Sequence, residues 1–125
     1  MSDEFKPSGY LSVSPYLIVR DAEKTPVFLV DVFGAERLRV IPDEGGGILH
    51  AEERIDDPVV MMGQMPDGAD SNMHVYVADA ETTFERARRA GGVVVQPLQR
   101  KGDGDYRGGI ADGDVAIWWI SQQGG

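Results

Sequence analysis

The chain has 125 residues, of which 42% are hydrophobic and 26% are charged, the size and composition of one folded domain rather than of a disordered segment. Its 21 Asp and Glu residues outnumber 12 Lys and Arg residues and give a net charge of −9, so we expect neither nucleic acid nor a membrane surface as a partner. The sequence contains no cysteine, which excludes disulfides, thiolate metal sites and a cysteine nucleophile. His50 and His74 are its two imidazoles.

The start of the chain is acidic and polar, and no apolar run approaches the roughly 20 residues that a membrane-spanning helix needs. We therefore expect residues 1–9 to form a loose leader that is neither a signal peptide nor an anchor. The absence of cysteine fits a reducing compartment, and the sequence predicts a soluble, cytoplasmic protein.

An internal repeat is the most informative feature of the sequence. Residues 19–25 match residues 77–83 at a shift of 58 positions, which carries Asp21 onto Asp79. The same shift aligns Gly34 with Gly92 and residues 59–61 with residues 117–119. The repeat indicates a duplicated module.

In chain order, an apolar and β-branched run over residues 12–19 predicts the first strand. Asp21 or Thr25 can cap the helix that follows, Pro26 suits its first position after a Thr25 cap, and Gly34 suits its left-handed end. Three strands are expected next, at about residues 37–41, 48–55 and 59–63, with turn-rich segments between them.

The second half repeats this order after a linker at residues 64–71. Asp79 is a natural cap for an amphipathic helix that ends at Gly91 and Gly92. Three further strands are expected at about residues 93–97, 106–111 and 115–121.

Each half is therefore a βαβββ module, the first over about residues 11–63 and the second over about residues 72–121, within a single domain at residues 10–121. A module of about 60 residues with one helix does not easily close a core alone. We predict an α+β fold in which the two modules form a curved mixed sheet around a cleft.

Short motifs support this organisation. They are found at residues 15–19, 32–36, 50–52, 55–62, 75–80, 84–87, 90–92 and 118–120. With the two βαβββ modules, they resemble the glyoxalase/bleomycin-resistance/extradiol-dioxygenase superfamily, also called vicinal oxygen chelate, and within it the PhnB-like proteins. The resemblance covers about residues 11–121 and implies the fold; the superfamily includes isomerases, dioxygenases, transferases and non-catalytic drug-binding proteins.

The resemblance also implies where a metal would be held, because the metalloenzymes of the superfamily bind one divalent ion with side chains from four strands. Those positions fall on Ser14, near Met61, and on Met73 and Trp119, none of which is a usual ligand for a hard metal. His74 is one residue from such a position, and one step along a strand turns a side chain to the opposite face. We therefore expect no metal and no cofactor.

Strand pairing predicts a cluster of polar residues. If residues 56 and 57 form a tight turn, Arg54 lies opposite Val59, Glu52 opposite Met61 and His50 opposite Gly63, and opposed residues share a face. The candidate ligand-binding residues are Tyr16, His50, Glu52, Arg54, Met61, Met73, Tyr106 and Trp119.

Six of the eight candidates suit a role in binding. Arg54 suits an anionic group, Tyr16 and Trp119 suit a planar ligand, and His50 with Glu52 can pass a proton. Tyr106 and Arg107 would reach the ligand from a mobile flap at residues 101–109. The alternative is an ordinary solvated strand face with core methionines and an ordinary loop. His74 and Tyr76 are expected to pack against the helices.

Three functions remain open. The leading one is a small-molecule-binding protein of the glyoxalase/bleomycin-resistance type with a degenerate metal site, holding a partly aromatic or anionic molecule. The alternative is a metal-dependent lyase, isomerase or dioxygenase that uses His50, Glu52 and His74. The third is a structural or regulatory dimer with a vestigial cavity. The apolar first helix favours a homodimer in each case, and the sequence names neither the ligand nor a catalytic residue.

Overall fold

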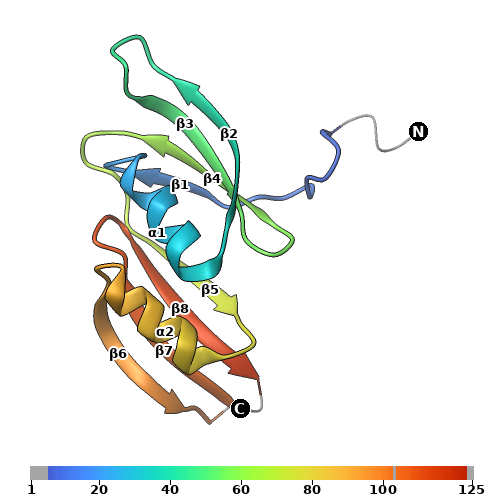
Figure 1. Cartoon of the computed structure of the whole chain (residues 1–125), viewed down its shortest axis with the longest axis vertical. Helices are drawn as coiled ribbons and strands as arrows, with labels where there is room; N and C mark the ends of the chain where they lie inside the picture. The colour runs from blue at the N-terminus through green and yellow to red at the C-terminus, as the bar shows by residue number, and fades with distance from the viewer. Residues whose placement is uncertain (1–5, 103, 124–125) are drawn as a thin grey trace.

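The structure is a computed structural model that describes residues 6–102 and 104–123. Module one consists of β1 (Tyr16–Val19), α1 (Lys24–Phe33), β2 (Glu36–Pro42), β3 (Ile48–Arg54) and β4 (Val59–Gln64). Module two consists of β5 (Ser71–Tyr76), α2 (Ala80–Arg89), β6 (Val93–Arg100), β7 (Asp105–Ala111) and β8 (Ala116–Gln123). The α+β class and the two βαβββ modules are confirmed (Figure 1). No helix within these described residues has the length and apolar character needed to cross a membrane.

Local chemistry explains where the helices begin and end. The N-cap position of α1 is Glu23, whose side chain makes no capping hydrogen bond, so neither Asp21 nor Thr25 is the N-cap that the sequence predicted. The Asp21 carboxylate instead accepts hydrogen bonds from the backbone N–H groups of Glu23 and Lys24 in the turn that leads into the helix. Pro26 then lies in the first turn, where its missing N–H costs no intrahelical bond. Gly34 ends α1 with a left-handed φ of 67°, as the sequence predicted. Asp79 caps α2 through the N–H of Thr82.

The strands form one four-stranded mixed sheet per module, in the orders β1-β4-β3-β2 and β5-β8-β7-β6. In each sheet the first and last strands of the module pair in parallel and the other pairs are antiparallel. The predicted register between β3 and β4 is confirmed, with Arg54 opposite Val59 and Glu52 opposite Met61. Residues 12–15, which were expected to extend the first strand, lie before β1.

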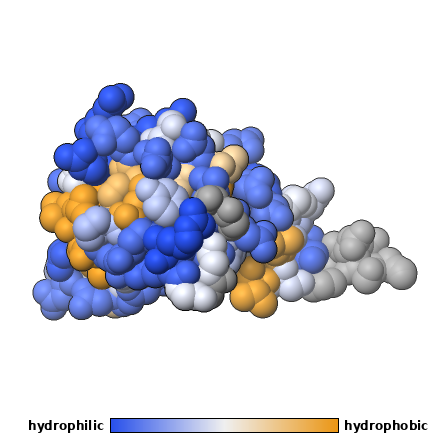
Figure 2. Space-filling view, turned by 90° about the horizontal axis from the view of Figure 1, so that it is seen from below, coloured by the Kyte–Doolittle hydropathy of each residue, from blue (hydrophilic) through white to orange (hydrophobic). Residues whose placement is uncertain are grey.

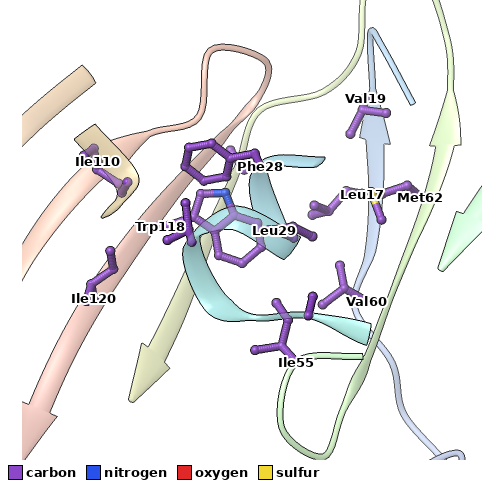
Figure 3. Close-up of a cluster of buried hydrophobic side chains, with 14 of the residues drawn as sticks. Leu17, Val19, Phe28, Leu29, Ile55, Val60, Met62, Ile110, Trp118 and Ile120 are labelled. Carbon is purple, nitrogen blue, oxygen red and sulfur yellow. The ribbon is translucent and has the colours of Figure 1, made fainter. Parts of the chain in front are cut away.

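The two modules share one hydrophobic core, to which α1, α2 and the helix-facing sides of both sheets contribute. Side chains of α1, such as Leu29, lie between Trp118 on β8 and Leu17 on β1 (Figure 3). The rings of Phe33 and Trp118 are 5.4 Å apart. Within one chain the helices therefore fill the space between the sheets. The opposite sides, called here the open faces of module one and module two, point away from the core.

A polar contact also joins the modules. The carboxylate of Asp114, in the turn between β7 and β8, accepts hydrogen bonds from the backbone N–H groups of Arg20 and Asp21 at 2.9 to 3.0 Å. The Arg20 guanidinium donates to the backbone carbonyl of Asp114 at 2.7 Å. Because the Asp114 side chain is only 8% exposed, these donors would be left without an equivalent acceptor if the carboxylate were removed.

We expect Asp114→Ala to lower the free energy of unfolding by about 2 kcal/mol, because backbone donors lose their acceptor at the boundary between modules. Urea denaturation of the variant and the natural protein measures the difference. Asp57→Ala is the matched control, since Asp57 is an exposed aspartate in the corresponding turn of module one; its effect should stay within about 0.5 kcal/mol. Equal effects of the two substitutions would contradict a special role for Asp114.

Glu53 is a buried acid on the helix-facing side of β3. Its Oε2 atom accepts a hydrogen bond from Nε of Arg37 at 2.9 Å, while its Oε1 atom is buried and accepts none from the residues that the structure describes. Burial raises the pKa of Glu53, and the contact with Arg37 offsets only part of this effect. Ionised Glu53 is therefore less favourable in the folded chain than in the unfolded chain.

The raised pKa of Glu53 predicts a pH dependence of stability. The stability that protonated Glu53 contributes is fully present below the pKa that Glu53 has in the unfolded chain. It is lost as pH rises through the pKa that Glu53 has in the folded chain. We therefore expect Glu53→Gln to gain stability relative to the natural protein as pH rises from about 4 to about 7. Urea denaturation across this range tests it, with Glu44→Gln in the exposed turn after β2 as the control. A difference that is independent of pH would contradict the raised pKa.

Candidate functional site

The open face of module one carries the predicted polar cluster. His50, Glu52 and Arg54 alternate along β3 and share this face with Met61 on β4, as their register requires. Tyr16 on β1 joins them, with its ring 5.8 Å from that of His50. Arg54 forms an ion pair with Glu36 on β2 at 3.6 Å. The structure thus brings together five of the predicted site residues.

A segment that the sequence analysis missed packs against this face. Residues 6–14, called here the N-terminal strap, precede β1 and contain no helix or strand. The carbonyl of Gly9 accepts a hydrogen bond from Arg54 at 2.8 Å, and the hydroxyl of Tyr10 donates to Oε1 of Glu52 at 2.5 Å. Residues 6–9 were expected to be a loose leader, but this part of the leader contacts the candidate site; residues 1–5 lie outside the described residues.

Glu52 is the centre of a hydrogen-bonded chain. The residue is 3% exposed, and its Oε2 atom lies 2.8 Å from Nε2 of His50. Nδ1 of His50 in turn lies 3.4 Å from the hydroxyl of Tyr16. The chain runs from Tyr10 through Glu52 and His50 to Tyr16, an arrangement that can relay a proton.

The pKa values of this chain favour a charged Glu52 and a neutral Tyr10. Burial by itself would raise the pKa of Glu52, but the hydrogen bonds from Tyr10 and His50 outweigh it and leave this pKa below its usual value. The same hydrogen bond raises the pKa of Tyr10, because the neighbouring carboxylate disfavours a phenolate. The pair therefore consists of a phenol donor and a carboxylate acceptor near neutral pH.

A cavity of about 510 Å³ lies between the strap and the sheet, within the roughly 300–1,000 Å³ typical of small-ligand sites. Its lining residues are Lys6, Pro7, Tyr10, Leu11, Ser12, Ser14, Arg39, Glu52 and Met61. The lining combines apolar side chains with two cationic groups and one buried carboxylate.

The open face of module two is aromatic. The indole of Trp119 donates from Nε1 to Asn72 at 3.0 Å. It lies so close to Gly109 that a Cβ there would be 2.6 Å from the ring, so only glycine lets the indole lie against β7.

His74 and Tyr76 share the open face of module two, with their rings 4.7 Å apart. The expectation that they pack against the helices was wrong, because the parallel register places His74 beside Trp119. Nε2 of His74 lies 3.0 Å from the hydroxyl of Ser121. Tyr76 donates to Asp105 at 2.7 Å, and Arg107 contacts the same carboxylate.

Two predicted site residues point elsewhere. Met73 is paired with Trp118, packs against the core and lines a separate groove of about 280 Å³ between β5 and the β3–β4 turn. Tyr106 packs against the core and donates to Glu81 of α2 at 3.1 Å. The expected flap at residues 101–109 was also wrong, since β7 begins at Asp105.

Whether Tyr16, His50, Glu52, Arg54, Met61 and Trp119 contact a ligand stays a prediction. Within one chain these residues form two separate groups, because Trp119 lies on the open face of module two and the other five lie on the open face of module one. The shared helix layer lies between the two faces.

The metal position implied by the resemblance does not fit the residues present. Of the four strand positions, only the one on β5 offers a usual ligand on the open face, and that ligand is His74 rather than Met73. The other three strand positions fall at or near Ser14, Met61 and Trp119, which are not usual metal ligands. Within the described parts of the chain, no three His, Cys, Asp or Glu side chains are arranged to hold a metal ion.

Comparison with curated proteins finds relatives without an assigned function. An uncharacterized protein of Mycobacterium bovis and one of Mycobacterium tuberculosis are each 31% identical to this chain over 125 residues, covering 89% of this chain and 82% and 74% of their own lengths.

Solved structures share the fold. TioX from Micromonospora sp. ML1 has a TM-score of 0.71 at 25% identity, covering 90% of this chain and 95% of its own. The fosfomycin resistance protein FosX from Listeria monocytogenes has a TM-score of 0.73 at 18% identity, covering 88% of this chain and 92% of its own. A mutant of that FosX, at 19% identity, is complexed with Mn(II) and 1S,2S-dihydroxypropylphosphonic acid; its TM-score is 0.69, and 92% and 91% of the two chains are covered.

A family profile described as the Glyoxalase/Bleomycin resistance protein/Dioxygenase superfamily matches residues 10–119, nearly the whole chain. Two βαβββ modules with this strand order and this match have one interpretation: the chain belongs to the glyoxalase/bleomycin resistance protein/dioxygenase superfamily.

Proposed function

We propose that this protein binds a small, partly aromatic and anionic molecule without a resident metal. The observation that carries the proposal is the cavity of about 510 Å³ on module one, which has a buried, fully hydrogen-bonded Glu52 in its wall. A carboxylate buried to this degree on an open sheet face is costly to maintain for stability alone. Lys6 and Arg39 add the positive charge that an anionic group requires.

Module two supplies the aromatic half of the proposed site. Trp119, His74 and Tyr76 present ring surfaces on its open face, and planar ligands stack on such surfaces. In a single chain this face is separated from Glu52 by the helix layer. We propose a homodimer in which the open face of module one in one copy meets the open face of module two in the other.

Exposed apolar side chains also favour self-association, and those on α1 lie outside the two open faces. Exposed apolar side chains occur on α1 at Val27 and Val30 and along β6 at Val93, Val94 and Val95. Figure 2 shows hydrophobic surface on the side of the molecule where β6 lies in Figure 1. Clusters of this kind on an otherwise acidic protein are typical of interaction surfaces.

The PhnB-like assignment and the cytoplasmic location remain proposals that rest on the sequence.

A metal-dependent lyase, isomerase or dioxygenase reaction is the alternative. The observation that favours it is the His50–Glu52 pair at 2.8 Å, which can act as a general acid and base. FosX, a more distant structural relative, is complexed with Mn(II) in one structure. The alternative requires His50, Glu52 and His74 to converge, and one chain places His74 on the other module.

Calorimetry with a panel of benzoate, 3-phenylpropionate, naphthalene-2-carboxylate and 3-(4-hydroxyphenyl)propionate tests the binding function. We expect at least one of these to bind equally well with and without EDTA. We expect Trp119→Ala to weaken binding roughly threefold to tenfold through loss of ring stacking. Met65→Ala, an exposed site in the linker, is the control and should have no effect.

Stoichiometric tight binding of Zn²⁺, Ni²⁺, Mn²⁺ or Fe²⁺ would favour the enzyme instead. Light scattering tests the dimer, for which we expect twice the 13.6 kDa mass of the chain. A monomer at micromolar concentration would contradict the shared site.

A further inference from the structure

The N-terminal strap places a tyrosine side chain in the wall of the proposed ligand cavity, against Glu52. The Tyr10 hydroxyl donates to Oε1 of Glu52 at 2.5 Å, and the residue lines the cavity together with Met61 and Ser14. A molecule in the cavity that is to donate to Oε1 of Glu52 must therefore displace the Tyr10 hydroxyl.

Glu52 restricts what can replace Tyr10. Its Oε2 atom is already paired with His50 at 2.8 Å, so Oε1 is the atom that needs a donor. Leaving a buried carboxylate oxygen without a donor costs more free energy than an average hydrogen bond contributes. A molecule that displaces Tyr10 must therefore bring an O–H or N–H group of its own to Oε1.

The strap is held in a way that permits displacement. Leu11 and Val13 within it are 49% and 83% exposed, so they bury little apolar surface. Its described contacts with the sheet include two polar ones, from Tyr10 to Glu52 and from Arg54 to the Gly9 carbonyl. A segment with few buried apolar contacts and no helix or strand opens at low free-energy cost.

The charges around the cavity indicate which second group the ligand carries. Lys6 and Arg39 line it together with Glu52, and their positive charge favours an anionic substituent on the ligand. The hydrogen bond to Glu52 raises the pKa of Tyr10, so this position favours a neutral phenol over a phenolate. The site therefore matches a molecule that combines a hydroxyl donor, an aromatic ring and an anionic group.

We propose that Tyr10 is an internal occupant of this site and that the ligand is a phenol with an anionic substituent, whose hydroxyl replaces that of Tyr10 on Glu52. The inference rests on the proposed binding function. It adds the chemical class of the ligand and identifies Tyr10 as the side chain that the ligand must displace. Tyr10 is not part of the shared hydrophobic core, so its removal leaves the packing of that core in place.

Two probes that differ by one hydroxyl test the proposal: 3-(4-hydroxyphenyl)propionate and 3-phenylpropionate. We expect Tyr10→Ala to bind the hydroxylated probe roughly tenfold to a hundredfold more tightly than the natural protein, because an internal competitor for a charged acceptor is removed. The probe without the hydroxyl should gain much less. Tyr106→Ala is the matched control, since it removes the phenol that donates to Glu81 on module two, and it should leave both affinities unchanged.

Two further measurements locate the effect. In the Tyr10→Ala background, Glu52→Gln should remove most of the preference for the hydroxylated probe, because the charged acceptor is lost. In the natural protein, NMR signals of the Tyr10 ring should shift on addition of the hydroxylated probe. Circular dichroism and urea denaturation show that each variant is folded, and the Tyr10→Ala comparison remains decisive if the Glu52 variant is not.

The possible failures are distinguishable. Equal affinity of folded Tyr10→Ala for the two probes would overturn the phenol inference and leave small-molecule binding intact. Failure of both probes to bind Tyr10→Ala, while naphthalene-2-carboxylate or benzoate binds in a Trp119-dependent way, would overturn the assignment of the ligand to Glu52. Absence of binding by the natural protein and the variant across the whole panel would overturn the proposed function as well.

Discussion

Burial of the sheet faces is the constraint on which the other features depend. A βαβββ module of about 60 residues has one helix and one sheet, too little to enclose a core. The two modules solve this by sharing one, with Trp118 of module two packed against Phe33 of module one. Since the helices occupy the inside of this arrangement, the opposite faces of both sheets are left outside. The places available for ligands follow from this packing.

The two open faces have diverged while keeping the same backbone. In module one the face carries an acid, an imidazole and basic groups around a cavity, and in module two it carries aromatic rings and an amide. Duplication supplies two copies of a surface, and substitutions on the strands change its chemistry without changing the core behind it. This separation explains how one fold supports several activities, which must be argued from the site rather than from the fold.

Much of the fold could be predicted from the sequence because it follows local rules. The repeat, the Asp79 cap, the Gly34 helix end and the register that opposes Glu52 and Met61 were all predicted and confirmed. The errors came from long-range information. The face of β5 depends on its parallel register with β8, which no turn fixes, so His74 and Met73 were exchanged between faces. The role of Tyr10 depends on a contact across 42 positions from a segment without periodicity.

The contact between Arg20 and Asp114 has a consequence for synthesis of the chain. Its two residues are 94 positions apart, and Trp118, which completes the core, lies later still. Contacts of such large sequence separation form slowly and late. Module one therefore leaves the ribosome with an apolar helix and a loop whose partners have not yet been made. Completion of the fold must wait for the last strands, because they supply the core partners of module one.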